Sequence, residues 1–248
     1  MNPAEFANIA RAEESFWWYR GMRRIMFRVL DPLVAARRFR RALDAGCGTG
    51  HFAKVVAERY ALPVVAVDFG YQGLEYGRCL GVPHLAQADI AALPFPEGTF
   101  DLVLSMDVIV HFPRGVESQA VRELARVLAP GGLLVLRAAA LDILRSRHSQ
   151  FAHERQRFTR SRLVRLVQEQ GLRVLRSTYA NSLLLPVALA KFRIWEPLMR
   201  KAPASGVRPV SPRLDRLLYA PLELESRWIG WGRNLPIGQS LVAVAEKK

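Results

Sequence analysis

The sequence has few cysteines and no long apolar run, and both absences limit what it can be. Its two cysteines, Cys47 and Cys79, are too few for a disulfide framework or a metal cage, and we expect no metal site. The longest purely apolar run, Leu183 to Ala190, is far shorter than the roughly 20 residues that cross a bilayer. The N-terminus lacks the basic-then-apolar pattern of a secretory signal. We therefore expect a cytoplasmic protein that is soluble, or at most peripheral to the inner face of the membrane.

Lysine is scarce, yet arginine is abundant enough to give a net charge of +14. An excess of this size is typical of proteins that bind nucleic acid or an anionic membrane. A GC-rich genome would produce the same arginine-rich composition. The charge thus leaves two interpretations open, a functional basic surface and a bias of composition.

Short β-branched or leucine-rich runs alternate with amphipathic helical stretches from Arg41 onward. This alternation favours an α/β fold, a doubly wound and mostly parallel sheet of seven strands covered by helices on both faces. We expect a helix stop and then a turn at Ala129 to Gly132. The predicted strands cover residues 42–45, 64–68, 84–88, 100–106, 133–137, 172–180 and 239–247, and the predicted helices cover 51–60, 71–80, 116–128 and 160–170.

Two accessory segments flank the predicted core. The first 40 residues have no strand signal and fit one or two amphipathic helices. Nearly 60 residues rich in Pro, Trp and Arg separate the last two strands, which is too long for a structureless loop. We therefore expect a helical lid over residues 1–40, a core over 41–180, a helical cap inserted over 181–238, and a final core strand over 239–248.

Three glycines at Gly46–Gly50 lie between the first predicted strand and a helix. Ligands of open parallel sheets bind at the carboxyl ends of the strands, where glycine allows close approach and a helix start attracts negative groups. A nicotinamide dinucleotide site would show G-x-G-x-x-G, whereas this loop reads G-x-G-x-G after Asp44. Asp68, 24 positions later at the next strand end, can accept both hydroxyls of a ribose, and Asp89 follows the third strand.

Four segments, in this order, resemble the successive motifs of class I S-adenosylmethionine-dependent methyltransferases. They read LDAGCGTG, VVAVDFG, QADIAALPFPEGTFDLVLSMDVIVHF and ELARVLAPGGLLVLR. The subgroup they look most like is the small-molecule, ubiquinone-biosynthesis type (type 11). The resemblance is close over residues 41–137 and looser over the remaining strands. It implies a Rossmann-like methyltransferase fold, S-adenosylmethionine as cofactor and S-adenosylhomocysteine as product.

The resemblance also implies which residues meet the cofactor. The glycine loop would lie under the methionine part, with Asp44 near its amino group and Asp68 on the ribose. Asp68 could instead be a simple helix cap, Asp107 could be structural, and Cys47 is expected only to fit the loop. The implied cofactor-binding residues are Asp44, Gly46, Cys47, Gly48, Gly50 and Asp68, then Phe69, Asp89 and Ile90 around the adenine, and Met106 and Asp107 near the sulfonium.

Methyl transfer needs the nucleophile, the methyl carbon and the sulfur aligned in a dry cleft, and a hydroxyl acceptor also needs a general base. The end of the fourth strand reads SMDVIVHF and lacks the Asn-Pro-Pro-aromatic run of enzymes that methylate amines of nucleic-acid bases. His153 and Arg157 are four positions apart and would share one face of a helix. The candidate bases are His111, His148, His153 and Tyr179.

Aromatic and basic residues predict the acceptor site. Four aromatics in the run Phe16 to Arg20 cannot all face one core, because successive helical residues point about 100° apart. We interpret them as a lid over cofactor and acceptor, the alternative being packing against the sheet edge. The arginines at 145–165 could grip a carboxylate or phosphate, or form a solvated face. The expected substrate-binding residues are Trp17, Trp18, Tyr19, Arg20, His111, Arg157 and Tyr179.

The function expected from these patterns is methyl transfer to an oxygen or carbon of a small hydrophobic, amphiphilic or anionic acceptor, such as a lipid, a glycolipid or a secondary-metabolite intermediate. The apolar cap suits a roof over such an acceptor or a helix lying on anionic lipid. Two alternatives are an RNA methyltransferase, favoured only by charge, and a non-catalytic methyltransferase-like protein that binds a membrane or a partner. No RNA-binding module is recognisable, so nucleic acid is not an expected partner. The sequence does not determine the oligomeric state.

Overall fold

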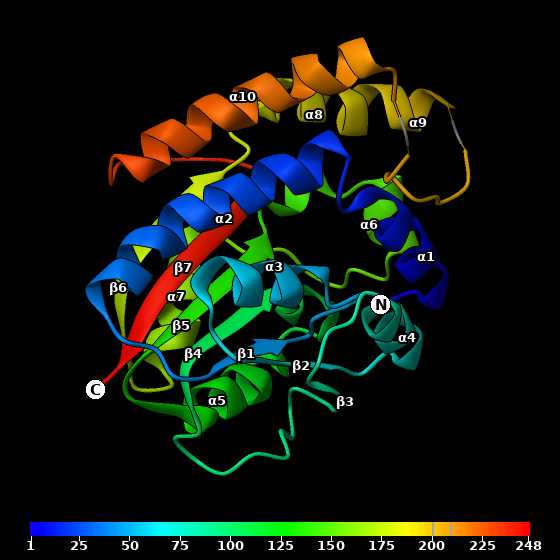
Figure 1. The fold of residues 1–248 in the computed structure, drawn as a ribbon. Coiled ribbons are helices and arrows are strands. Elements are labelled where there is room, and N and C mark those ends of the chain that lie inside the picture. The colour runs from blue at the N-terminus through cyan, green and yellow to red at the C-terminus, as the bar shows by residue number, and fades with distance from the viewer. Residues whose placement is uncertain (200, 209) are drawn as a thin grey trace.

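Seven strands form one sheet in the order β3-β2-β1-β4-β5-β7-β6 (Figure 1). The computed structural model describes residues 1–199, 201–208 and 210–248. Paired strands are parallel except at β7, which runs antiparallel to both β5 and β6. The predicted doubly wound, mostly parallel sheet is therefore confirmed. The strands are β1 (Ala42–Ala45), β2 (Val64–Asp68), β3 (Leu85–Gln87), β4 (Phe100–Met106), β5 (Leu128–Ala139), β6 (Leu172–Ala180) and β7 (Ser240–Lys247).

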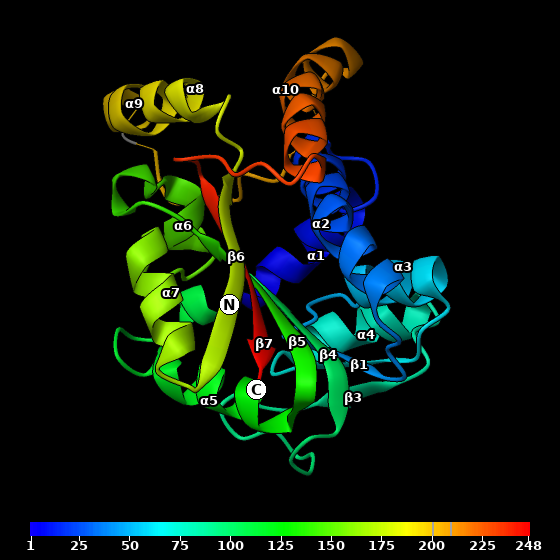
Figure 2. The ribbon, with the colours of Figure 1, turned by 90° about the vertical axis from the view of Figure 1, so that its left-hand side faces the viewer.

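Helices cover both faces of the sheet, as Figure 2 shows. Side chains of successive strand residues point to opposite faces, so each strand contributes to two cores. Leu43 and Val103 pack with α5 (Glu117–Val127) and α7 (Arg160–Gln168) on one face. Ala42 and Leu102 pack with α2 (Trp17–Ala36), α3 (His51–Tyr60) and α10 (Pro212–Gly230) on the other. Because both faces of the sheet are covered, its central strands are almost wholly apolar. The helices that connect the strands are α3 (His51–Tyr60), α4 (Tyr71–Cys79), α5 (Glu117–Val127) and α7 (Arg160–Gln168).

The predicted turn at Ala129–Gly132 is a bulge within a strand and not a turn that precedes the strand. Helix α5 does end before it, but β5 begins at once at Leu128, and the four residues form an irregularity inside this strand. Phe100 pairs with Leu128 while Leu102 pairs with Leu133, so the extra residues bulge out of the ladder. Gly131 has a φ of 73°, a positive value that glycine adopts readily in a bulge of this kind.

Two helices form the N-terminal segment, α1 (Pro3–Ala12) and α2 (Trp17–Ala36). Asn2 caps α1 through its side chain, which accepts a hydrogen bond from the Ala4 N–H. Helix α2 packs along α10 (Pro212–Gly230), where Gly21 lies so close to Leu222 that an added Cβ would stand 2.3 Å from its Cδ1. The N-terminal segment and the insertion therefore meet each other as well as the sheet.

The insertion between β6 and β7 is helical, as the sequence predicts. Besides α10 it holds α8 (Leu185–Ala190), a π-helical turn η3 (Lys191–Trp195) and α9 (Glu196–Met199). The remaining short helices are η1 (Ile109–His111), η2 (Asp142–Leu144) and α6 (Arg147–Phe151). Among the residues that the structure describes, none of these helices combines the length and apolar character needed to cross a membrane.

Candidate functional site

A cavity of about 1160 Å³ lies at the carboxyl ends of β1, β2 and β4. Its floor is the loop between β1 and α3 together with the residues that end the strands. Its walls come from α1 and the start of α2 on one side, and from the α6 region and the insertion on the other. Every predicted cofactor-binding residue except Gly50 is part of this lining.

The glycine loop is bare for two different reasons. Gly46 has a φ of 83°, and a Cβ there would stand 2.2 Å from a methyl carbon of Val108. Gly48 has a φ of 60°, but a Cβ there would meet no atom within 4 Å. Glycine at position 46 is thus required by packing, whereas glycine at 48 leaves open space at the cavity floor.

Asp68 is held in place by the main chain around it. Its Oδ2 accepts a hydrogen bond from the Gly48 N–H at 2.8 Å, and its Oδ1 accepts one from the Gly70 N–H at 2.7 Å. Burial raises the pKa of this carboxyl, and the two N–H groups oppose the rise. Each oxygen keeps a lone pair for a further donor, so two neighbouring hydroxyls of a ribose could bind here.

Asp44 is fully buried at the end of β1 and lines the same cavity. Its Oδ2 has no hydrogen-bond partner among the residues that the structure describes. Burial, together with the charge of Asp68, raises the pKa of Asp44 to about 7. A buried carboxylate oxygen without a partner, in a residue that lines a cavity, fits a cationic group such as the amino group of an amino acid.

The residues that follow β2 and β3 give the cavity an apolar and aromatic surface. The Phe69 side chain is 73% exposed although it lines the cavity, and Ile90, another lining residue, is buried. Asp89 turns one oxygen to the Ala91 N–H and also lines the cavity. A planar base can stack on such an open ring, because stacking needs an apolar face and little else.

Arg137 is a cavity residue that sequence reasoning missed. It pairs in register with Met106, and its guanidinium holds the Asp107 carboxylate at 2.6 Å while lying 5.2 Å from the ring centroid of Trp18. Asp107 has a φ of 59°, a conformation that bulky residues avoid. The sequence did hold a signal for this cavity residue, because Arg137 ends the fifth predicted strand, beside the end of the fourth.

The N-terminal segment closes one wall of the cavity. Trp17, Trp18 and Tyr19 all line it, and burial raises the pKa of the Tyr19 hydroxyl far above its usual range. The Thr49 hydroxyl donates a hydrogen bond to the Glu13 carboxylate, which joins α1 to the glycine loop. Nothing in the local sequence around Glu13 indicated this contact, because its partner is 36 positions away.

Arg20 does not belong to the cavity as predicted. Its guanidinium donates to Asp215 of α10 at 2.7 Å and lies over the ring of Tyr219 at 4.6 Å. Four consecutive residues of a helix point in different directions, so Trp17 to Tyr19 reach the cavity while Arg20 faces the insertion. Its observed role is to connect α2 with α10.

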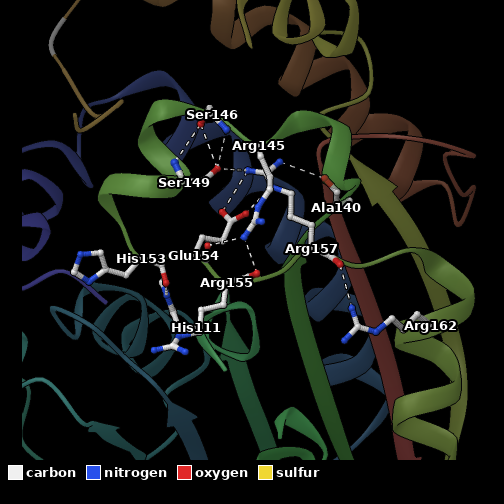
Figure 3. A network of polar contacts seen from close by, with 10 residues as sticks. All are labelled: His111, Ala140, Arg145, Ser146, Ser149, His153, Glu154, Arg155, Arg157 and Arg162. Carbon is white, nitrogen blue, oxygen red and sulfur yellow. Dashed lines mark hydrogen bonds and ion pairs between the residues drawn. The ribbon is translucent and has the colours of Figure 1, made fainter. Parts of the chain in front are cut away.

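His111 lies in the cavity wall, just after β4. Its Nδ1 is 3.3 Å from the carbonyl oxygen of His153, which fixes the proton on Nδ1 and leaves Nε2 as an acceptor (Figure 3). Burial, assisted by the nearby N-terminal amino group, lowers the pKa of His111 to about 4. The imidazole is therefore neutral at physiological pH.

The predicted helical pair of His153 and Arg157 is absent. Helix α6 ends at Phe151, and His153 itself has a φ of 58°, which turns the chain out of the helix. His153 is exposed and lies outside the cavity lining. Arg157 does line the cavity, but its guanidinium pairs with Glu154 at 2.5 Å.

The two other candidate bases are in different surroundings. His148 of α6 lines the cavity, where its Nδ1 accepts a hydrogen bond from the Gly206 N–H at 3.1 Å. Tyr179 is buried in β6 away from the cavity, and its hydroxyl accepts a hydrogen bond from the Arg160 N–H. The Tyr179 side chain packs into the core on the α7 side, so the structure gives no support to the prediction that it acts as base or substrate ligand.

Most arginines of residues 145–165 hold the chain together instead of facing a ligand (Figure 3). Arg145 donates to the carbonyl oxygens of Glu154 and Arg155, and Arg162 binds Glu117 and Gln156. A guanidinium has five N–H donors, so one arginine can satisfy several carbonyl groups of an irregular loop. The members of this group that line the cavity are Arg147, Arg155 and Arg157.

Comparison with known proteins agrees with this geometry. Residues 43–136 match the family model described as a methyltransferase domain. This segment is a class I methyltransferase domain. The family and the fold expected from the sequence motifs are thereby confirmed, and S-adenosylmethionine is the cofactor on which this class depends. The roles of the individual site residues stay predictions.

Similar proteins extend the comparison beyond the family model. A malonyl-(acyl-carrier protein) O-methyltransferase of Enterobacter lignolyticus is 40% identical over 121 residues, 47% of each protein. A 2-methyl-6-phytyl-1,4-hydroquinone methyltransferase of Synechocystis is 35% identical over 98 residues, 38% of this chain and 30% of the relative. The chain thus spans less than half the length of these curated relatives.

A solved structure agrees with the fold over nearly the whole chain. The SAM-dependent methyltransferase from Archaeoglobus fulgidus aligns with a TM-score of 0.60 at 17% identity, covering 95% of this chain and 97% of the other. At this identity the agreement concerns the fold alone.

Proposed function

We propose that this protein transfers a methyl group from S-adenosylmethionine to an oxygen or carbon of a small amphiphilic acceptor. The observation that carries the proposal is the joint placement of Asp44, Asp68 and the glycine loop at one end of a single large cavity. At about 1160 Å³ it exceeds the roughly 300–1,000 Å³ of a typical ligand site. The cavity therefore offers room for a cofactor and a second molecule.

The residues present fit the proposed cofactor by their chemistry. Asp68 would hold the ribose hydroxyls, and Asp44 would meet the amino group through its orphaned oxygen. The exposed ring of Phe69 would take one face of the adenine. When bound, S-adenosylmethionine supplies a methyl group on a sulfonium, which is a good leaving group. The chain's own contribution is then to align the acceptor and to exclude water.

His111 is the strongest candidate for a general base. It is the histidine of the cavity wall nearest in sequence to the end of β4, and its low pKa keeps it neutral. With the Nδ1 proton donated to the His153 carbonyl, Nε2 can accept a proton from an acceptor hydroxyl. His148 is less suited, because its Nδ1 already accepts the Gly206 N–H and the ring bridges α6 to the insertion.

The cavity lining also combines aromatic or apolar residues with cations. Phe112, Phe192 and Leu218 belong to it, as do Arg155 and Lys191. Such a wall suits an acceptor with an apolar body and an anionic group. The name of the phytyl hydroquinone methyltransferase points to an amphiphilic acceptor of that relative, which supports the same class here.

Two measurements test the proposal in sequence. Calorimetry with S-adenosylhomocysteine should show one binding site on the native protein, and absence of binding would overturn the cofactor assignment. Incubation with methyl-labelled S-adenosylmethionine and cell extract should then place the label in the lipid or small-molecule fraction. Label in RNA instead would refute the acceptor class while leaving the methyltransferase assignment intact.

A further inference from the structure

The outer faces of the two helical segments in the insertion are strongly apolar. The first segment runs from α8 through η3 to α9, the second is α10, and both lie at the same end of the molecule in Figures 1 and 2. Leu217, Leu198 and Trp231 are about 70% exposed. Exposed apolar patches of this extent mark a binding surface. The other exposed apolar residues are Leu183, Val187, Ile194, Trp195, Met199, Leu214, Leu224, Trp228 and Ile237.

Helix α10 has apolar residues on opposite sides. Leu222 and Ile229 are buried against the sheet core together with residues of α2. Leu217, Leu224 and Trp228 follow one another at intervals of seven and four residues, so they form a stripe on the exposed side. Packing against α2 explains why Leu222 and Ile229 are apolar, but it does not explain the exposed stripe. An amphipathic surface helix would carry polar residues where the second stripe lies.

The fully exposed charges on this surface have one sign. Among the described residues of 181–238, each of the four acids is buried or half-buried. Asp215 is used by Arg20, and Glu225 accepts the Ser182 N–H. The exposed charged residues of this segment are Lys191, Arg193, Lys201, Arg208, Arg213, Arg216, Arg227 and Arg233.

An apolar face whose fully exposed charges are all positive favours some occupants over others. In a symmetric pair of copies, the same patch would face itself and bring cations against cations. An anionic bilayer supplies both an apolar interior and negative headgroups at the right depth. Three of the five tryptophans of the chain, Trp195, Trp228 and Trp231, lie on this face. Tryptophan is enriched where a membrane meets water.

We propose that this face, formed by residues 183–199 and 213–237, docks the protein on an anionic lipid bilayer. Leucine and tryptophan side chains enter the boundary between headgroups and acyl chains, and the arginines and lysines pair with lipid phosphates. The same two helical segments line the cavity through Lys191, Phe192 and Leu218. Docking therefore brings this part of the cavity lining next to lipid. The binding itself does not depend on methyl transfer.

Vesicle sedimentation of the full chain, without cofactor, tests the proposal. We expect binding to vesicles of equimolar phosphatidylcholine and phosphatidylglycerol, and about tenfold weaker binding to phosphatidylcholine alone. The double variant Leu217→Glu/Leu224→Glu should bind the anionic vesicles about tenfold less than the native protein. The matched variant Leu175→Glu alters an exposed leucine of β6 and should bind like the native protein.

A second variant separates charge from apolar contact. Arg213→Glu/Arg216→Glu leaves the leucine stripe intact, and it should also lose binding and the dependence on phosphatidylglycerol. All these positions are exposed and outside the cavity lining, so thermal unfolding and S-adenosylhomocysteine affinity should stay native. Equal binding to both vesicle types, binding to neither, or a native dimer that dissociates in Leu217→Glu/Leu224→Glu would each overturn the proposal.

Discussion

The Gly48 N–H donates a hydrogen bond of 2.8 Å to the carboxylate of Asp68, which lies 20 positions later at the end of the neighbouring strand. The bond forms because β1 and β2 are parallel neighbours, so that both strand ends open on the same edge of the sheet. It orients an acid beside a stretch of exposed main chain. The cofactor proposal depends on this arrangement.

Asp68→Asn should weaken S-adenosylhomocysteine binding by about 10- to 100-fold, because hydrogen bonds to a charged group each contribute about 1.5–3 kcal/mol. Calorimetry measures the change. Asp142→Asn is the matched control, since Asp142 is exposed and outside the cavity lining. Unchanged affinity in Asp68→Asn would mean that the carboxylate only caps the loop.

Asp44 should make cofactor binding depend on pH. Its pKa of about 7 keeps it largely neutral at pH 6, whereas a bound amino group favours the ionised form. Affinity for S-adenosylhomocysteine should therefore rise between pH 6 and pH 8 and then level off. Calorimetry in buffers of different ionisation heat should detect proton release near pH 7. A flat profile would place the amino group elsewhere.

Asp44→Asn should also change stability with a defined sign. A folded-state pKa raised above the unfolded value gives stability that is present at low pH and lost as pH rises towards 7. The variant lacks this loss, so its melting temperature relative to the native protein should be higher at pH 8 than at pH 5. Differential scanning calorimetry without ligand measures the melting temperatures of both proteins at both pH values. Cofactor affinity of the variant should fall, which separates stability from binding.

Gly46→Ala and Gly48→Ala should differ in kind. Both add a Cβ to a residue with positive φ, which costs about 1–2 kcal/mol. Only at Gly46 must Val108 also move, so Gly46→Ala should have the lower denaturation midpoint. Gly48→Ala should lose only this backbone cost in stability yet bind S-adenosylhomocysteine more weakly, because its methyl group enters the cavity. Equal loss of stability in both variants would contradict this interpretation.

His111→Gln should lower the turnover number by about 100-fold or more if the acceptor is a hydroxyl, as expected when a general base is lost. Affinity for S-adenosylhomocysteine should change little. The label transferred to the accepting extract fraction measures the rate, with His84→Gln as control at an exposed histidine outside the cavity lining. A native rate in His111→Gln would favour a carbon acceptor or another base.

Phe6→Ala tests whether α1 acts as a lid. The Phe6 ring packs against Gly70 and Gly73 at the start of α4, so its loss should free α1 locally. Hydrogen exchange should show faster exchange in α1, and S-adenosylhomocysteine should bind more weakly. Phe95→Ala removes an aromatic that packs on Phe100 at the start of β4, outside the cavity lining, and should leave cofactor affinity native.

The succession of strands and helices and the floor of the cavity could be predicted from local sequence patterns. Strand periodicity and a Gly-x-Gly-x-Gly turn are local patterns, and parallel strands bring their ends to one edge whatever the side chains do. Asp44 and Asp68 could therefore be placed from sequence. The bulge at Ala129–Gly132 could not, because the partner strand decides whether these residues turn or bulge.

Which distant side chains meet the cavity depends on the packing of the folded chain. Arg20 turned to Asp215, 195 positions away, and Tyr179 turned into the core, while Glu13 reached Thr49. Such contacts depend on how separate elements pack, and no repeating pattern in the sequence records them. The same holds for the membrane-docking face, whose apolar residues are spread over two helices that only the fold brings to one end of the molecule.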